Sequence, residues 1–552
     1  MHAEPAQAAS APASAATVFA RAWPAVPAAA VAVLVLLRLA FDQGGYFPAA
    51  YTSAAAVAFI ALAVLVLRPP RRRLSTHALI AIGALAALAC WIGLSRMWSV
   101  VPDVPLLDMK RAMLYLALFG LGLLAADSGR HARVLVWSVL GVIVAICAAG
   151  LLSRLQPDVV RSATDPSVAV FYRLDHPLGY WNAFGALASL GAVLALGLAA
   201  DPRANAVLRA AGAGAALVLV VAMYLSLSRG AWLAMIVGTV VLVAIHPRRG
   251  ALLLTLAIVA GTAAIAVLRL RGYPALVTDP KAGSGQEAQG SAFTRELIGL
   301  VLAAVGAQAA LALVRAPRLL ESHVTALRRI TLIGGAIVLV LVAGAGYAAR
   351  GSEAEGGVTA AVHDTTDWLD RQWQDFLNPT ANASEGTGAA RLITAKGARS
   401  DLYRVAIDGF EAQPLTGGGA GSFEVRYARD RDVDVKSRDA HSLPLETLSE
   451  LGVVGLLALL GFVGAVAAAA RRSLVGKGVI RPAEAAAVTS AFAVWFAHAG
   501  VDWDWEMPVL TGTAIVLSAA LFQRGRRRRS RRNHSGFRAN RRAGASGARS
   551  AR

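Results

Sequence analysis

Charged residues are scarce in this sequence. Only 16% of its 552 residues are Asp, Glu, Lys or Arg, whereas 56% are hydrophobic. A soluble domain carries about 25% charged residues, which cover its water-facing surface. The apolar residues also come in long runs, and Ala54–Leu67 and Gly214–Leu225 contain no charge at all. This composition excludes an ordinary soluble domain and indicates a membrane protein, because a helix needs about 20 mostly apolar residues to cross a bilayer.

Cysteine is nearly absent as well. Cys90 and Cys147 are the only two, and both lie within apolar runs, so we expect neither a disulfide framework nor a cysteine-based metal site. The N-terminus is rich in Ala and Pro and lacks the basic start and compact cleavage pattern of a signal peptide. We predict that residues 1–22 form a disordered cytoplasmic segment and that the first apolar run is retained in the mature protein.

The apolar runs predict an all-α fold, a polytopic bundle of about 14 transmembrane helices with a range of about 12–14. Helices are expected because backbone groups in lipid must be hydrogen-bonded within their own segment. Residues 23–349 would hold the first eleven helices and residues 442–523 the last three. The predicted spans are residues 24–41, 51–68, 76–94, 111–126, 132–152, 178–199, 206–225, 230–246, 250–268, 294–315, 330–349, 442–470, 482–501 and 508–523.

Lys and Arg are concentrated in alternate connections and in the tail 524–552, which holds twelve arginines and no acid. The positive-inside rule therefore places the tail, and both termini, in the cytoplasm. A basic tail can also bind nucleic acid, but beside a membrane helix it more simply anchors the chain to anionic lipid. We therefore expect a lipid bilayer and no nucleic acid as partner. The basic connections are residues 71–73, 130–133, 246–249, 315–329 and 471–481.

The longest connection, residues 350–441, falls on the opposite, extracytoplasmic side. It is polar and contains two patches with helical character, Thr366–Phe376 and Ser400–Glu411. A loop of this length in a compact protein is usually functional.

Arg229 lies in a short connection, Ser228-Arg229-Gly230, on the same side. The positive-inside bias works against an arginine there. Either Arg229 snorkels to the membrane interface, or its planar guanidinium faces an anion such as a phosphate.

The long loop offers two further arginines, Arg399 and Arg404, followed by the glycine-rich run Pro414–Phe423 that includes Gly419. Glycine allows a ligand to approach the backbone closely. The run is not a Walker P-loop, because no Gly-Lys-Ser/Thr follows it.

A histidine closes the long loop. His441 leads into an apolar helix together with Glu446 and Glu450, which are four residues apart and share a helix face. A lone histidine is most often structural, but ionisable residues at membrane depth are costly and suggest function.

Two more polar tracts lie on the same side. One contains His176 and Asn182, and the other contains His498, Asp502 and Asp504 among tryptophans typical of a membrane interface. The aspartates could orient a base or an arginine. The histidines match no compact metal-ligand spacing, so we expect no metal.

Together these motifs resemble the O-antigen ligase and polymerase superfamily of bacterial membrane glycosyltransferases. The resemblance extends from Ser95 to Pro508, with the ligase-like catalytic region at about residues 205–465. The matching pieces are Trp98–Pro102, His176–Gly185, Ser228-Arg229-Gly230, Arg399–Phe423 with its Pro-Leu-Thr-Gly-Gly-Gly core, and Ala440-His441 with Leu448–Gly452. The family's usual count is about twelve spans, fewer than the sequence predicts here.

The resemblance implies transfer of a glycan from a polyprenyl-diphosphate carrier to an acceptor hydroxyl, at the outer side of the bacterial cytoplasmic membrane, without cofactor or metal. The family's functional arginines and histidine fall on Arg229, Arg399 and His441, with Arg404 as the other match in the loop. Fixed donors would stabilise the leaving diphosphate, a histidine base would activate the acceptor, and direct displacement would invert the anomeric carbon. We expect substrate contacts from Arg404, Gly419, Glu446, Glu450, Asn182, His176 and Asp502.

Three alternatives stay open at this point. A polysaccharide polymerase would share these motifs, because only the acceptor (a glycan, a lipid or a protein) separates it from a ligase. A transporter or lipid-glycan flippase would need polar groups near the bilayer midplane and interrupted helices. A purely structural membrane protein would leave the long loop unexplained.

Overall fold

The computed structural model describes residues 24–67, 74–160, 172–277, 283–313 and 397–523, with the single positions 374, 377 and 378. These parts form helices and connections without strands, which confirms the all-α prediction for the described residues. Each predicted span except residues 330–349, which lie outside the described residues, overlaps a helix. The helices of the first part are α2 (Ala25–Ala40), α3 (Pro48–Val66), α4 (Thr76–Leu94), α5 (Val104–Ala125), α6 (Gly129–Leu155), α7 (Trp181–Ala199), α8 (Ala206–Leu225), α9 (Arg229–Ile245), α10 (Arg249–Leu270), α11 (Pro274–Val277) and α12 (Gly283–Leu313).

The remaining helices lie within residues 397–523. They are α16 (Arg399–Ala412), α17 (Ser422–Asp430), α18 (Leu443–Leu474), α19 (Pro482–Ala499) and α20 (Pro508–Ala519), with short 3₁₀ turns η1 (Gln43–Gly45), η2 (Ser95–Met97) and η4 (Asp504–Glu506). Among the described helices, eight are long and apolar enough to cross a membrane: α3, α4, α6, α7, α8, α10, α12 and α18. Helices α2, α9 and α20 are apolar but shorter. The chain is therefore a multi-pass membrane protein, and the count of about 14 spans stays a prediction.

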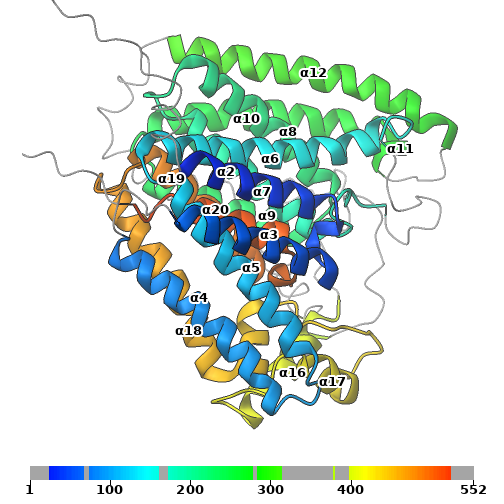
Figure 1. Cartoon of the computed structure of the whole chain (residues 1–552). Coiled ribbons are helices and arrows are strands. Elements are labelled where there is room, and N and C mark those ends of the chain that lie inside the picture. Colours follow the sequence, from blue (N-terminus) through cyan, green and yellow to red (C-terminus); the bar gives the residue numbers. More distant parts are fainter. Residues whose placement is uncertain are drawn as a thin grey trace, which may run out of the picture.

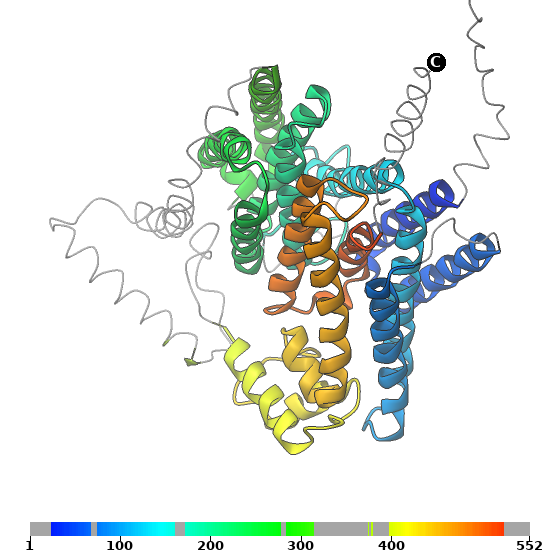
Figure 2. The same ribbon diagram turned by 90° about the vertical axis from the view of Figure 1, so that its left-hand side faces the viewer.

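Helix α7 lies at the centre of the bundle. Its residues from Ala183 to Ala199 are all buried, and it packs against α8, α9 and α19. Its small side chains allow this close packing: a Cβ on Gly197 would lie 2.6 Å from the Cβ of Ala487 on α19. Helix α12 covers one edge of the bundle (Figure 1). Helix α7 begins at Trp181, so Asn182 lies in its first turn. Helices α16 and α17 lie together at one end of the structure (Figures 1 and 2).

Helix α18 is interrupted at Gly452, and the interruption docks the glycine-rich run. Gly452 has a left-handed backbone with φ of 63°, which favours glycine. The carbonyls of Ser449 and Glu450 therefore lose their usual helical partners and accept hydrogen bonds from the amides of Gly418 (3.0 Å) and Gly419 (2.8 Å). This exchange fixes the connection between α16 and α17 against the first turns of α18.

The predicted orientation of the bundle can be tested with two exposed positions at opposite ends of it. Asp434, whose side chain is 90% exposed, follows α17, and Val475 follows α18. In a chain with Cys90 and Cys147 replaced, we expect Asp434→Cys to react with a membrane-impermeant maleimide in intact spheroplasts. Val475→Cys should react only after permeabilisation. The reverse pattern would invert the predicted topology.

Candidate active site

Asp502 joins three other predicted site residues into one cluster. It lies between α19 and α20 and is completely buried. Its Oδ1 lies 3.1 Å from Nδ1 of His441, and its Oδ2 accepts hydrogen bonds from Nδ2 of Asn182 (2.7 Å) and Nη2 of Arg399 (3.0 Å). The hydroxyl of Tyr180 also donates to Oδ1 at 2.8 Å. Segments far apart in the chain, from α7, α16, the start of α18 and the α19–α20 connection, thus meet at a single carboxylate.

The surroundings of Asp502 keep it ionised. Burial alone would raise the pKa of this carboxyl, but the hydrogen bond with His441 and the charge of Arg399 bring the pKa below its usual range. An anionic partner at Nδ1 holds the proton on that nitrogen and leaves the lone pair on Nε2. The His441 side chain is 24% exposed, so its ring can be reached from outside the cluster. The arrangement suits a histidine that accepts a proton through Nε2.

His441 has a left-handed backbone, with φ of 54°, which is uncommon for a residue other than glycine. Such conformations persist only where the surroundings determine them, often at functional sites. Here the hydroxyl of Tyr403 donates to the His441 carbonyl at 3.3 Å, and the preceding amide of Ala440 donates to Oε2 of Glu446 at 2.7 Å. These bonds turn the imidazole toward Asp502. They also give Glu446 a part in shaping the backbone around His441.

Arg229 is the first residue of α9. The N-cap residue Ser228 accepts a hydrogen bond from the amide of Ala231 at 3.2 Å. The positive end of the helix dipole therefore lies at the residue that carries a guanidinium, and both favour an anion.

The turn before Arg229 is tied to the cluster by Arg173, which is not among the predicted site residues. Arg173 donates to the carbonyls of Ser226 (2.8 Å) and Leu227 (2.9 Å) and to Oδ1 of Asn182 (2.9 Å). No motif marks Arg173. The only signal was its place in a predicted extracytoplasmic connection, where arginine is disfavoured, as it is for Arg229.

Arg404 and Gly419 have other surroundings. Arg404 forms ion pairs with Asp401 (2.6 Å), Asp408 (3.2 Å) and Asp432 (3.0 Å), so Arg399 is the loop arginine that reaches Asp502. Gly419 has φ of 91°, and a Cβ there would lie 2.5 Å from the Cβ of Ser99. The close approach of the chain to the α4–α5 connection explains why this position is a glycine.

Neither His176 nor Glu450 touches Asp502 among the described contacts. Burial lowers the pKa of His176, which favours its neutral form, and Oε1 of Glu450 accepts from the amide of Phe423 at 3.0 Å.

A second imidazole–carboxylate pair lies next to the first. Nδ1 of His498 is 2.8 Å from both oxygens of Asp504, and both side chains are completely buried. Asp502 and Asp504, two residues apart, thus hold different histidines. Because His498 is buried and His441 is partly exposed, only His441 is placed to meet a substrate without rearrangement.

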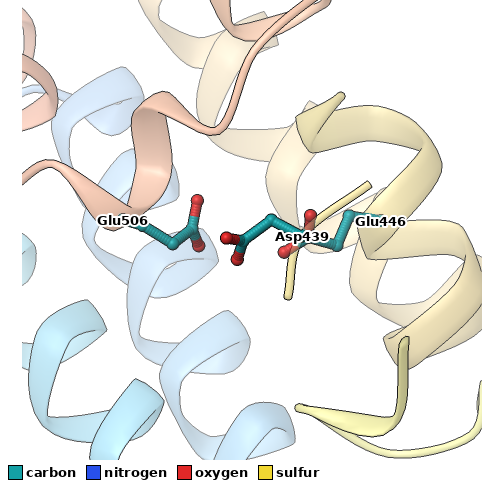
Figure 3. Close-up of side chains that lie close together, drawn as sticks. All are labelled: Asp439, Glu446 and Glu506. Atoms are coloured by element: carbon teal, nitrogen blue, oxygen red, sulfur yellow. The ribbon is translucent and has the colours of Figure 1, made fainter. Parts of the chain in front are cut away.

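Three carboxylates form an acidic cluster beside the segment that carries His441. Asp439, Glu446 and Glu506 come from three elements, and their oxygens lie within 4.8 Å of one another (Figure 3). They line a cavity of about 130 Å³ together with Glu450 and Arg111, and Arg111 pairs with Glu506 at 3.1 Å. Burial raises the pKa of Asp439 to about 6 and also raises that of Glu506. The three oxygens are a set that could share protons or coordinate a divalent cation.

Asp439→Asn should make the stability of the protein less sensitive to pH. Because burial raises the folded-state pKa of Asp439 from 3.8 to about 6, its contribution to stability is present at low pH and is lost as the pH rises through about 6. Between about pH 4 and pH 7 the variant should lose about 2–3 kcal/mol less stability than the wild type. Thermal unfolding in detergent at both pH values measures this. Equal losses in the two proteins, with the exposed Asp434→Asn as control, would contradict the burial of this charge.

The helices and the polar cluster at one end of them define a multi-pass membrane protein with a histidine–aspartate site. Residues 293–460 match the O-antigen ligase family. The chain therefore carries an O-antigen ligase domain, which confirms the resemblance drawn from its motifs. Members of this family are membrane glycosyl-transfer enzymes, and the family implies a lipid-linked glycan donor. A search of curated proteins finds no match for the chain.

The matched region contains Arg399 and His441 but neither Arg229, Asn182 nor Asp502. The contacts of Asp502 therefore extend the site beyond the segment that the family match covers.

Proposed function

We propose that the protein transfers a glycan from a polyprenyl-diphosphate carrier to an acceptor hydroxyl, at the outer face of the bacterial cytoplasmic membrane. The observation that carries this proposal is the buried Asp502 carboxylate, which contacts both the imidazole of His441 and the guanidinium of Arg399. A base and an anion-binding group of the O-antigen ligase domain thus share one anchor, which lies outside the matched residues 293–460.

In the proposed reaction, Nε2 of His441 takes the proton of the acceptor hydroxyl as its oxygen attacks the anomeric carbon. Asp502 holds Nδ1 and stabilises the imidazolium that forms. The bond from the anomeric carbon to the diphosphate breaks, and its electron pair goes to the diphosphate oxygen. A single displacement of this kind inverts the anomeric configuration.

The leaving diphosphate is acidic and needs no proton, but its developing charge needs fixed donors. Arg399 gives one amino group to Asp502 and is 31% exposed, so its other N–H groups can contact the diphosphate. Arg229 and the start of α9 would supply the second contact. With two arginines in this role, we propose that transfer requires no metal.

Glu446 and Glu450 indicate where the acceptor would bind. Both line the acidic cavity next to the segment of His441, and carboxylates are strong hydrogen-bond acceptors for sugar hydroxyls. The acceptor, whether a lipid, a protein or the end of another glycan, distinguishes ligase from polymerase. The same residues would serve both reactions.

Arg229→Lys should weaken use of the lipid-diphosphate donor although it keeps the positive charge. Lysine lacks the planar pair of donors that matches a phosphate, and one charged hydrogen bond contributes about 1.5–3 kcal/mol. We expect the donor KM to rise by about tenfold or more, measured by in vitro transfer in detergent. Arg269→Lys is a matched control, because Arg269 pairs with Glu296 and is not one of the predicted site residues. Full activity of Arg229→Ala at normal membrane abundance would refute this role.

A further inference from the structure

Arg173 bridges two parts of the proposed site. It is buried, with 8% of its surface exposed, and its guanidinium lies over the ring of Trp181, 4.7 Å from the centroid. On one side it donates to the turn that precedes Arg229, and on the other it donates to Asn182. A guanidinium in this position holds both partners in a fixed relation, because its donors are arranged in a rigid plane.

The turn before Arg229 depends on these bonds. Leu227 has φ of 49°, a left-handed conformation that costs energy in a residue with a side chain. The carbonyls of Ser226 and Leu227 lie at the end of α8, where helical partners run out, and both point to Arg173. The amide of the next residue, Leu174, donates to the carbonyl of Leu225 at 3.0 Å. Without Arg173 two buried carbonyls would lose donors, and the turn that places Arg229 would be free to relax.

The bond to Asn182 acts on the other half of the site. Because Oδ1 of Asn182 accepts from Arg173, its amide nitrogen faces Oδ2 of Asp502 at 2.7 Å and the hydroxyl of Tyr180 at 2.8 Å. The same Asp502 oxygen accepts from Arg399. A continuous set of hydrogen bonds therefore runs from the turn of Arg229 through Arg173 and Asn182 to Asp502.

We propose that Arg173 is a positioning residue. It holds Arg229, which would bind the diphosphate, in a fixed position relative to the proposed base His441 and its partner Asp502. Arg173 contacts neither the donor nor the acceptor in the proposed reaction, and the inference rests on the proposed function. Its consequence is that a single buried side chain controls both donor affinity and the rate of transfer. An arginine that supported only the fold would lower stability without acting through Arg229.

A double-mutant cycle separates these roles. Arg173→Ala should raise the donor KM and lower kcat. The factor by which Arg173→Ala raises the donor KM should be at least about threefold smaller in an Arg229→Ala background than in the wild type. The reason is that Arg229, through which Arg173 would act, is already absent in that background. Arg209→Ala is the matched control, because Arg209 is equally buried and donates to the carbonyl of Ala199 at 3.0 Å, at the other end of α8. It should leave the donor KM unchanged.

Arg173→Lys provides a second test if Arg173→Ala is poorly folded. A lysine cannot reach both carbonyls and Asn182 with fixed geometry, so we expect an intermediate donor KM at normal abundance. Independent, multiplicative effects of Arg173→Ala and Arg229→Ala would overturn the proposal, as would wild-type kinetics of Arg173→Lys or an equal KM effect in Arg209→Ala. Failure of the wild type to use any lipid-diphosphate donor would instead overturn the proposed function itself.

Discussion

His441→Ala should slow glycan transfer by about 10²–10⁴-fold, the usual effect of removing a general base, while the donor KM stays nearly unchanged. The imidazole contacts Asp502 through Nδ1, and it would reach the acceptor hydroxyl through Nε2. The groups proposed to bind the diphosphate, Arg229 and Arg399, are separate side chains. Removal of the ring should therefore affect the chemical step rather than the binding of the donor.

The pH dependence distinguishes a base from a residue that only supports the fold. Catalysis by an unprotonated base gives a rate that rises with pH, so the wild type should show a rise that the residual rate of His441→Ala lacks. His131→Ala is a matched control, since His131 pairs with Asp127 and is similarly exposed, at 21%. It should keep both the wild-type rate and the wild-type pH profile. A normal rate in His441→Ala, or a defect confined to donor affinity, would show that His441 is not the base.

Asp502→Asn should lower the rate by a similar factor, about 10²–10⁴-fold, although it only replaces one carboxylate oxygen with an amide NH2 group. The side chains of Asn182, Tyr180 and Arg399 all donate to the Asp502 carboxylate. An amide at this position presents N–H groups to some of these donors and no longer stabilises the imidazolium of His441. The variant should therefore lose both the orientation of the base and its stabilisation.

Combination with His441→Ala tests whether the two residues act as one unit. Residues that share a catalytic step are strongly non-additive, so Asp502→Asn should slow the His441→Ala variant little further. Transfer rates of the two single variants and the double variant, at matched abundance in membranes, measure this. Additive effects would mean that Asp502 acts on the fold or on the donor and not through His441.

The sequence was informative where the pattern is local. Apolar runs placed the helices because the length needed to cross a bilayer and the hydrogen bonding of the backbone constrain them strongly. The start of α5 was predicted at residue 111 but lies at Val104. Its first turns contain Pro105 at a helix-starting position and Asp108, which favour a loop by composition although proline is well tolerated at the start of a helix.

The site was predicted as a set of residue types but not as an arrangement. The partners of Asp502 lie 61, 103 and 320 residues away in the sequence, and no periodicity relates such distant positions. Arg173 was missed for the same reason, since two of its partners are carbonyls of a turn formed only by the fold.

Arg404 is different, because its ion pairs could have been anticipated. Asp401 and Asp408 lie three residues before it and four residues after it on the same helix, at spacings that bring side chains together.

We propose that His441 and Asp502 catalyse transfer from a polyprenyl-diphosphate glycan without a metal. The assay that tests this uses the purified protein, reconstituted in liposomes with a defined polyprenyl-diphosphate glycan, an acceptor and an excess of chelator. It quantifies glycosylated acceptor and released polyprenyl diphosphate together. We predict that the wild type forms the two products in equal amounts, with inverted anomeric configuration, and that His441→Ala forms about 10²–10⁴-fold less of both. Three results would contradict this mechanism: retained anomeric configuration, undiminished turnover by His441→Ala, or a requirement for a divalent cation. The cluster of Asp439, Glu446 and Glu506 could hold such a cation.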